Sequence, residues 1–345
     1  MPMRYRSHPD GRLLQDTMNK PKIALYWCAG CGGCEASVMD LGDDLLKLAQ
    51  SAEIIFWPAA MDARFSDLEA LADGSIFMSL INGAIQQEDH VDMVRLLRKK
   101  SRYVIANGAC AHIGGVIGLA NLHRPEEALQ KAYIDAETVV NPSRILPGSQ
   151  PDCPLPRPLN RVRTLDQVIE VDYFIPGCPP PPELVKQAIF CLLENRLPPK
   201  GSILSENRAL CHSCPRQGTL PERLSVRRFK RIHETLWNPL QCFLEQEIIC
   251  LGPCTRGGCR SRCISANMPC RGCMGPLDNI RDQGAGAISF IASLMDTTDP
   301  EKIAEIVSDI ADPAGLFYRY SLAASLIRTC NKGPGRTDGS LKETT

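Results

Sequence analysis

Short apolar runs alternate with amphipathic segments from residue 22 to about residue 195, and this alternation constrains the fold more than any other feature of the chain. The apolar runs are typical of buried strands, and we expect strands at 22–27, 53–57, 76–81, 102–106 and 172–175. Apolar residues recur at helical spacing in three segments, and we expect helices at 36–50, 89–100 and 183–195. This order predicts an α/β fold with a flavodoxin-like, doubly wound parallel sheet.

The pattern changes near residue 200, where cysteine pairs, arginines and short turns replace the strands and helices. We therefore expect the sheet domain to be followed by a smaller, cysteine-rich domain with little regular structure. A proline-rich stretch at 140–160 is interpreted as an ordered loop within the first domain. The predicted units are a polar extension (1–20), the sheet domain (21–200), the cysteine-rich domain (201–295), a C-terminal helical segment (296–330) and a polar tail expected to be disordered (331–345).

The chain has 17 cysteines among 345 residues, an odd number, and its first 20 residues do not resemble a signal peptide. These features favour a reducing cytoplasm, where clustered thiols bind metal instead of forming disulfides. Positive and negative charges balance at 39 each, which gives no electrostatic reason to expect nucleic acid. No apolar run reaches the roughly 20 residues that a membrane-spanning helix needs.

Cysteines follow three of the predicted strands. Cys31 and Cys34 follow the first strand, Cys110 follows the fourth and Cys178 follows the fifth, each beside glycine or proline. Because the carboxyl ends of parallel strands meet at one edge of a sheet, we expect these four thiols to converge there. Buried structural thiols and a tetrahedral zinc site are the alternatives, but structural zinc is usually held by short knuckle pairs.

Apart from Cys242, which stands alone, the cysteine-rich domain carries eight cysteines in two closely spaced groups, the number that two four-cysteine iron–sulfur clusters need. A pair of zinc ribbons is the alternative for this domain taken alone. The spacing does not divide the eight between two sites: Cys211, Cys214, Cys250, Cys254, Cys259, Cys263, Cys270 and Cys273.

The first domain resembles the small, electron-transferring subunits of nickel–iron hydrogenases. The resemblance is carried, in order, by CGGCEAS, ANGACAHIGG and FIPGCPPPPE. It implies that the matching cysteines hold a proximal 4Fe-4S cluster facing the nickel–iron site of a separate large subunit. The implied ligands are Cys31, Cys34, Cys110 and Cys178.

The resemblance continues through the second domain, toward the cytoplasmic methyl-viologen-reducing and deazaflavin-reducing branch. It is carried by CxxCPR, CLGPxTRGGC and PCRGCxGP, and it implies a medial and a distal cluster, for three 4Fe-4S clusters in all. Cys254 stands where relatives are expected to have a small apolar residue, so either Cys254 or another group such as His212 completes the set.

The resemblance implies a chain that relays electrons and contributes no catalytic residue and no nickel site. Its implied partners are the large subunit and an electron-accepting iron–sulfur or flavin subunit, either heterodisulfide-reductase-like or deazaflavin-reducing. A quinone-reducing respiratory subunit of the same fold is one rival, but it is marked by two adjacent cysteines, and this sequence has no such pair. A zinc-binding scaffold protein is the other.

Several residues remain outside these assignments. Glu35, next to a predicted ligand, is either a proton relay or hydrogen-bonding neighbour of the cluster, or a solvated carboxylate in the first turn of a helix. The basic run at 227–233 (RRFKRIH) is either a solvated helix face or a partner-docking surface. Five cysteines have no partner at ligand spacing and are not expected to bind iron: Cys28, Cys153, Cys191, Cys242 and Cys330.

Overall fold

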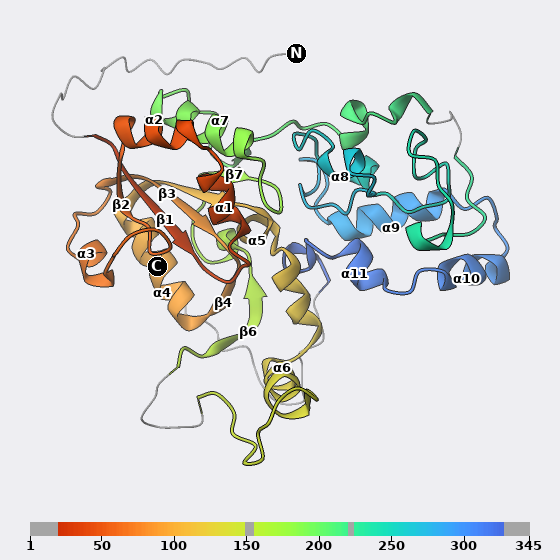
Figure 1. The fold of residues 1–345 in the computed structure, drawn as a ribbon, viewed down its shortest axis with the longest axis horizontal. Coiled ribbons are helices and arrows are strands. Elements are labelled where there is room, and N and C mark those ends of the chain that lie inside the picture. Colours follow the sequence, from red (N-terminus) through yellow and green to blue (C-terminus); the bar gives the residue numbers. More distant parts are fainter. Residues whose placement is uncertain (1–19, 149–154, 220–223, 328–345) are drawn as a thin grey trace.

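The computed structural model describes residues 20–148, 155–219 and 224–327. The predicted extension, except its last residue, and the predicted tail lie outside these ranges. The first part of the chain forms a sheet covered by helices, and the cysteine-rich part lies beside it with short helices and long connections (Figure 1). Within the described ranges, no helix is both long and apolar enough to cross a membrane.

Six parallel strands form the sheet in the order β2-β1-β3-β5-β7-β8. Apart from the added edge strand β8, this is the flavodoxin order, so the predicted fold class is confirmed. The sheet extends slightly past residue 200, because β8 pairs with β7. The strands are β1 (Lys22–Trp27), β2 (Glu53–Phe56), β3 (Ile76–Asn82), β5 (Ser101–Asn107), β7 (Tyr173–Ile175) and β8 (Ser202–Ile203).

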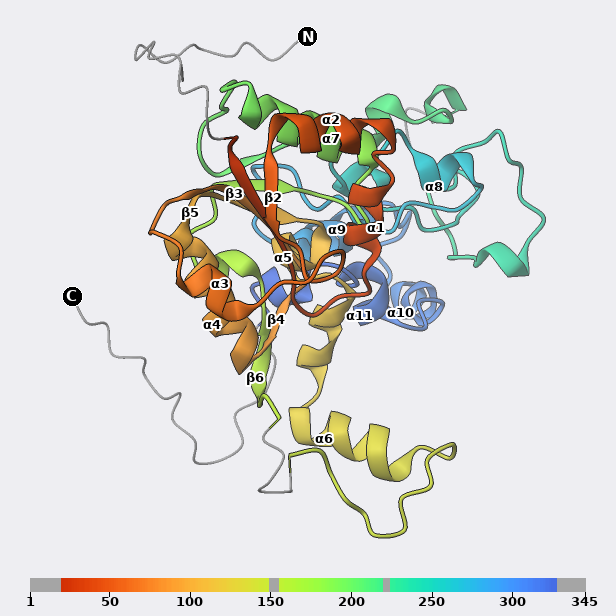
Figure 2. The same ribbon diagram turned by 60° about the vertical axis from the view of Figure 1, so that its left-hand side comes forward.

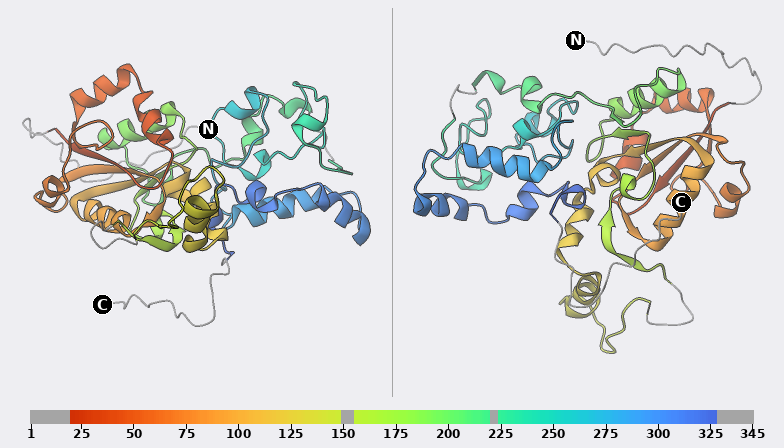
Figure 3. Two further views of the ribbon diagram at one scale, coloured as in Figure 1. Left: turned by 60° about the horizontal axis from the view of Figure 1, so that its bottom comes forward. Right: turned by 180° about the vertical axis from the view of Figure 1, so that it is seen from behind.

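Helices cover both faces of the sheet (Figures 1 and 3). One face packs against α1 (Gly33–Met39), α2 (Asp43–Ser51) and α7 (Pro182–Leu193). The other packs against α3 (Phe65–Glu69), α4 (Glu88–Lys100) and α5 (Ala109–Ile113).

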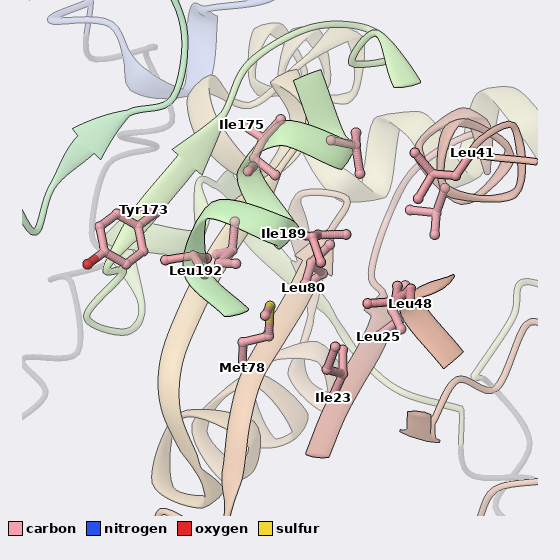
Figure 4. Packing of buried hydrophobic residues seen from close by; sticks show 14 of the residues in the cluster. Ile23, Leu25, Leu41, Leu48, Met78, Leu80, Tyr173, Ile175, Ile189 and Leu192 are labelled. Atoms are coloured by element: carbon pink, nitrogen blue, oxygen red, sulfur yellow. The ribbon is translucent and has the colours of Figure 1, made fainter. Parts of the chain in front are cut away.

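The strands are nearly continuous apolar runs because each has a core on both sides. Figure 4 shows the first core, in which Ile23, Leu25, Met78 and Leu80 from the strands meet Leu48 and the residues of α7. The sheet is therefore a rigid support for the loops at its ends.

Two predicted segments differ in the structure. The helix expected over 36–50 is broken into α1 and α2, because the chain turns at Gly42 with φ of 57°. The proline-rich stretch at 140–160 is a loop only in part, because Pro158 begins strand β6 (Pro158–Arg163), which pairs antiparallel with β4 (Ile85–Gln87). An edge strand tolerates proline because its outer N–H group has no partner to lose.

Between β5 and β6 the chain makes an excursion that projects from the body of the sheet domain (Figure 2). It contains η1 (Val116–Leu122), α6 (Pro125–Gln130) and the short helix η2 (Lys131–Asp135). None of these three helices was predicted, because the sequence of residues 116–135 shows little amphipathic periodicity.

The cysteine-rich region has few regular elements, as predicted. Most are single turns, and its longest helix is α9. The buried residues of its apolar core include Cys250 and Cys270. The elements are η4 (Leu210–Ser213), η5 (Gln217–Thr219), η6 (Ile232–Glu234), η7 (Gly252–Cys254), α8 (Arg262–Ser265) and α9 (Gln283–Ser293).

The C-terminal segment leads back from the cysteine-rich region to the sheet domain. It contains α10 (Pro300–Ser308), α11 (Pro313–Phe317) and η8 (Leu322–Ala324). Gln167, in the single turn η3 (Leu165–Gln167), donates to the Ala323 carbonyl at 3.0 Å, so η8 is fixed against the first domain.

Candidate functional site

The loops after β1, β5 and β7 meet at the carboxyl edge of the sheet. The Gly108 amide donates to the Ile175 carbonyl at 2.8 Å, and the Ala109 amide donates to the Gly177 carbonyl at 2.7 Å. These bonds join the loop that carries Cys110 to the loop that carries Cys178. Two of the three cysteine-bearing loops are therefore joined directly through their backbones.

Glycines allow the thiols to lie against the backbone at two points. A Cβ atom at Gly108, which has φ of 91°, would fall on the sulfur of Cys34. A Cβ atom at Gly115, with φ of 59°, would fall on the sulfur of Cys110. Only glycine suits both the backbone conformation and the space at these positions.

The four thiols of this edge act on one another electrostatically. Burial, and then the charges of Cys110, Cys178 and Cys31, raise the pKa of Cys34. Burial, followed by Cys178 and Cys31, raises the pKa of Cys110 to about 12. Burial and Cys31 also raise the pKa of Cys178. Buried thiols that disfavour each other's ionisation are stabilised as thiolates once a metal centre supplies positive charge.

The donor set fits an iron–sulfur cluster. Within the described ranges, no group of three or more His, Cys, Asp or Glu side chains is placed to hold a single metal ion. The thiols are neighbours, but they come from three loops around a shared space, and a four-iron cluster takes one thiolate on each iron. The Gly33 amide donates to the Cys31 sulfur at 3.4 Å, a contact of the kind that tunes cluster potentials.

Glu35 is buried, with 8% of its surface exposed, so its interpretation as a solvated carboxylate is wrong. It accepts a hydrogen bond from Trp57 Nε1. With its amide nitrogen turned toward Glu35, Asn82 donates to Oε1 at 2.9 Å. Burial raises the pKa of Glu35, and these two hydrogen bonds oppose the rise. The side chain therefore joins α1 to the loop after β2 and to the last residue of β3.

A second set of thiols lies next to the first. Burial raises the pKa of Cys273 to about 12, and the charges of Cys178, Cys259 and Cys263 add to the rise. The backbone amide of Cys178 opposes it. Cys273 therefore lies between a ligand predicted for the first domain and two thiols of the second. The buried Arg256 helps to hold this region, because it donates to the Pro276 carbonyl at 3.1 Å and pairs with Asp278.

A third set is centred on Cys211. Burial, and then the charges of Cys250, Cys214, Cys242 and Cys254 in decreasing order, raise its pKa to about 12. Cys242, which has no partner at ligand spacing in the sequence, lies near this set, since its charge acts on the Cys211 and Cys250 thiols.

The loops that carry Cys214 and Cys242 are joined by direct contacts. The Cys242 amide donates to Thr219 Oγ1 at 2.8 Å. Arg216 donates to the Gln241 carbonyl at 3.2 Å and stacks on the Phe243 ring at 4.1 Å from its centroid. The CPR motif thus binds the neighbours of Cys242 on both sides.

Sequence spacing did not reveal Cys242 because a reversal of the chain separates it from Cys250. The Ile248 amide donates back to the Phe243 carbonyl at 2.9 Å, and Glu247 adopts φ of 64°. The signal in the sequence was weak: the stretch QCFLEQEIIC contains both thiols without a glycine or proline to mark a turn.

The remaining thiols of the second domain have distinct positions. Cys270 lies beside Cys250: the Cys270 amide donates to the Cys250 sulfur at 3.3 Å. Burial raises the pKa of Cys270, and the charges of Cys250 and then Cys273 add to the rise. Burial and the charge of Cys250 raise the pKa of Cys254 to about 11. His212, the alternative ligand, is exposed.

Two of the five cysteines set aside as structural are buried in the sheet domain. Cys28 is 6% exposed, and its pKa is raised by burial and by Asp89. Cys191 donates from its thiol to the Arg196 carbonyl at 2.7 Å. Cys153 and Cys330 lie outside the described residues.

The chain is similar, over most of its length, to iron–sulfur subunits of F420-non-reducing hydrogenases. It is 36% identical to the F420-non-reducing hydrogenase iron–sulfur subunit of Archaeoglobus profundus, across 89% of this chain and 97% of the relative. It is 35% identical to an F420-non-reducing hydrogenase subunit of Methanothermobacter marburgensis, across 92% of this chain and 99% of that relative.

Residues 31–192 match the family model described as NADH ubiquinone oxidoreductase, 20 Kd subunit. Among solved structures, a chain of the NAD+-reducing [NiFe]-hydrogenase in its H2-reduced state is 30% identical, with 52% of this chain and 94% of that chain covered and a TM-score of 0.47. A chain of the [NiFeSe] hydrogenase from Desulfovibrio vulgaris Hildenborough is 18% identical, with 76% of this chain and 96% of that chain covered and a TM-score of 0.48.

Proposed function

Because this chain belongs to the family of F420-non-reducing hydrogenase iron–sulfur subunits, small subunits of nickel–iron hydrogenases, we propose that it relays electrons through three 4Fe-4S clusters. The relay would connect the nickel–iron site of a large subunit with an electron-accepting subunit. One observation carries this proposal: three sets of mutually close thiols follow one another from the edge of the sheet into the second domain.

The first set would hold the proximal cluster, with Cys31, Cys34, Cys110 and Cys178 as ligands. Cys31 is exposed, and the neighbouring Trp27 is 42% exposed although it is a large apolar side chain. An exposed ligand beside an exposed tryptophan suits a surface that a partner covers. We infer that the large subunit binds at this edge.

For the other clusters we propose a division that the spacing left open. The medial ligands would be Cys259, Cys263, Cys270 and Cys273, since the charges of Cys259 and Cys263 act on Cys273, and that of Cys273 acts on Cys270. The distal ligands would be Cys211, Cys214, Cys242 and Cys250, since the charges of the other three thiols raise the pKa of Cys211. Cys242 thus replaces Cys254 in the set of twelve.

Iron–sulfur clusters, when bound, supply one-electron transfer. The residues of the chain hold them away from water and direct amide groups at their sulfurs. Such donors include the Arg216 amide, which lies 3.4 Å from the Cys214 sulfur, and the Cys270 amide at Cys250. Hydrogen bonds to sulfur and burial are the main means by which a protein sets a cluster potential.

We place the protein in the cytoplasm, with an iron–sulfur or flavin subunit of the heterodisulfide-reductase-like or deazaflavin-reducing kind as acceptor. A quinone-reducing respiratory subunit is the second candidate, because residues 31–192 match the family model of such a subunit. The two candidates differ in whether the assembled complex consumes dihydrogen.

The test uses the complex purified without oxygen. We expect about 12 iron and 12 sulfide per copy of this chain, and negligible zinc. Cys211→Ser should lose about 4 iron and most acceptor reduction, while exchange of deuterium between dihydrogen and water continues, because that reaction needs only the large-subunit site. Cys178→Ser should also impair assembly, since its thiol lies at the edge we assign to the large subunit.

A preparation with stoichiometric zinc and about 4 iron would contradict the three-cluster proposal. Loss of isotope exchange in proportion to acceptor reduction in an intact Cys211→Ser complex would contradict the outward relay. Reduction of quinone without any reaction with dihydrogen would favour the respiratory candidate.

A further inference from the structure

A groove of about 340 Å³ opens between the basic segment 229–233 and the connection from α10 to α11. The run at 227–233 was interpreted as a solvated helix face or a docking surface, and the structure excludes a continuous helix. Arg227 and Arg228 form a bend between bridges at Val226 and Lys230, and the run ends in the single turn η6. Phe229 points inward, with 4% of its surface exposed.

Basic side chains dominate the charged lining of this groove: Lys230, Arg231, His233, Arg271 and Arg319. Lys230 pairs with Glu247 at 2.6 Å, and Arg319 donates to the Gly315 carbonyl at 2.8 Å. By contrast, the guanidinium groups of Arg231 and Arg271 have no hydrogen-bond acceptor among the described residues.

The two carboxylates of the lining already accept hydrogen bonds from backbone amides. Asp309 accepts from Phe229 at 3.0 Å, and Asp312 accepts from Gly315 at 2.8 Å. Arg271 and Arg319 line the same groove, and two cations in one groove repel each other. An anionic occupant would relieve that repulsion.

The floor of the groove is apolar. Ile248 and Ile249 are buried beneath it, and Met268 is 49% exposed at its side. A floor of this kind with cations around it suits a segment that carries both carboxylates and apolar side chains. A polyphosphate would gain nothing from the floor and would meet the two carboxylates.

The groove adjoins the thiols proposed for the outer clusters. Ile249 immediately precedes Cys250, and Arg271 lies between Cys270 and Cys273 in the sequence. The charges of Cys250 and Cys270 act on Arg271 directly. A subunit bound here would therefore lie next to the end of the relay that is farthest from the sheet.

We propose that this groove binds an acidic, partly apolar segment of the electron-accepting subunit. The proposal rests on the proposed function, since it names the docking site of that acceptor. The terminal segments of this chain are poor occupants, because both are net basic: residues 328–345 carry four basic and two acidic side chains, and residues 1–19 carry three arginines and two aspartates.

The test compares two arginines of the same run in the complete enzyme. Arg231 lines the groove, whereas Arg228 is exposed outside it. In Arg231→Glu, the KM for the purified acceptor subunit in dihydrogen-dependent reduction should rise about tenfold or more, because a like charge replaces an attractive one. Arg231→Lys should restore the KM to within about threefold, and Arg228→Glu should leave it near the unmodified value.

Three controls make the result decisive. The iron content of each preparation reports whether the clusters are intact. Carbodiimide treatment of the Arg231→Lys complex should join the introduced amine to an Asp or Glu of the acceptor subunit, which tests the groove even if Arg231→Glu fails to assemble. The KM of the unmodified enzyme should also rise with salt.

An unchanged KM in Arg231→Glu, an equal effect of Arg228→Glu, or cross-links that avoid the groove would overturn the docking site. So would Arg231-dependent binding to anionic vesicles or DNA without any change in the acceptor KM. Failure of the proposed function looks different, because the unmodified complex would then lack the iron or fail to reduce its acceptor with dihydrogen, and both proposals would fall.

Discussion

The two halves of the molecule hold their cysteines in different ways. In the sheet domain, the four candidate ligand thiols sit on loops at the end of a sheet, and none of them belongs to its two apolar cores. In the cysteine-rich region, Cys250 and Cys270 belong to the core itself, and most elements are single turns. A scaffold built from backbone hydrogen bonds and apolar packing folds before its metal binds, whereas a core built around thiols depends on the metal for its stability.

Removal of the clusters gives the largest expected difference between the halves. After chelation of iron under reducing conditions, amides of residues 205–295 should exchange hydrogen about tenfold faster or more, while the strands of the sheet domain remain protected. Hydrogen-exchange mass spectrometry of the loaded and stripped protein measures both regions in one sample. Equal loss of protection in strands and cysteine loops would show that the sheet, too, depends on its cluster.

Replacement of single thiols tests which of them belong to the metal-dependent core. Cys242→Ser should lose about 4 iron per chain, because its thiol lies among those of Cys211 and Cys250, whereas Cys254→Ser should retain about 12. Iron analysis of both variants, with Cys191→Ser as a buried cysteine outside the sites, decides the assignment. Loss of iron from Cys254→Ser alone would return Cys254 to the set of ligands in place of Cys242.

A single methyl group tests how closely the sheet domain fits its thiols. Gly108→Ala places a Cβ atom on the Cys34 sulfur and requires an unfavourable φ of 91°, so we expect part of the proximal iron to be lost and stability to fall by about 1–3 kcal/mol. Gly218→Ala is the matched control, because nothing lies within 4 Å of its Cβ position. Iron content and urea unfolding measure the effect, and full iron loading of Gly108→Ala would contradict the close fit.

Asp172 tests the scaffold without touching any thiol. It is fully buried, pairs with Arg98 and Lys200 at 2.6 Å each, and accepts the Val104 amide at 2.8 Å. Burial acts to raise its pKa, but the hydrogen bonds from Lys200, Arg98 and Val104 outweigh it, so the pKa is lowered. Asp172→Asn should therefore destabilise the sheet by about 3 kcal/mol near neutral pH.

The sign of the pH dependence follows from the lowered pKa. The carboxylate stabilises the folded state fully above its unfolded pKa of about 3.9, and this contribution is lost as the pH falls through the folded value. Urea unfolding of Asp172→Asn and the parent should therefore differ less at about pH 3 than at about pH 6, with the exposed Asp62→Asn as control. An equal difference at both pH values would show that charge is not the cause.

The sequence by itself determined the parallel sheet and the carboxyl edge at which its cysteine-bearing loops lie. Long runs such as 76–81 and 102–106 are apolar on both sides because both faces of the sheet are covered, and that pattern needs no knowledge of the tertiary structure. The parallel order then places the loops of Cys31, Cys110 and Cys178 at one edge. Backbone hydrogen bonds join the last two of these loops, and the sulfur of Cys34, just after the first loop, lies at the Cβ position of Gly108.

Tertiary structure alone decided the arrangement of the second domain. Where single turns replace strands and helices, no periodicity records which segments meet, and spacing in the sequence loses its meaning as a guide to distance. Cys242 reaches Cys211 because Arg216 binds the Gln241 carbonyl and the Phe243 ring, a long-range contact that leaves no local trace. The burial of Glu35 was likewise hidden, because it depends on Trp57 in the loop after β2 and on Asn82 at the end of β3.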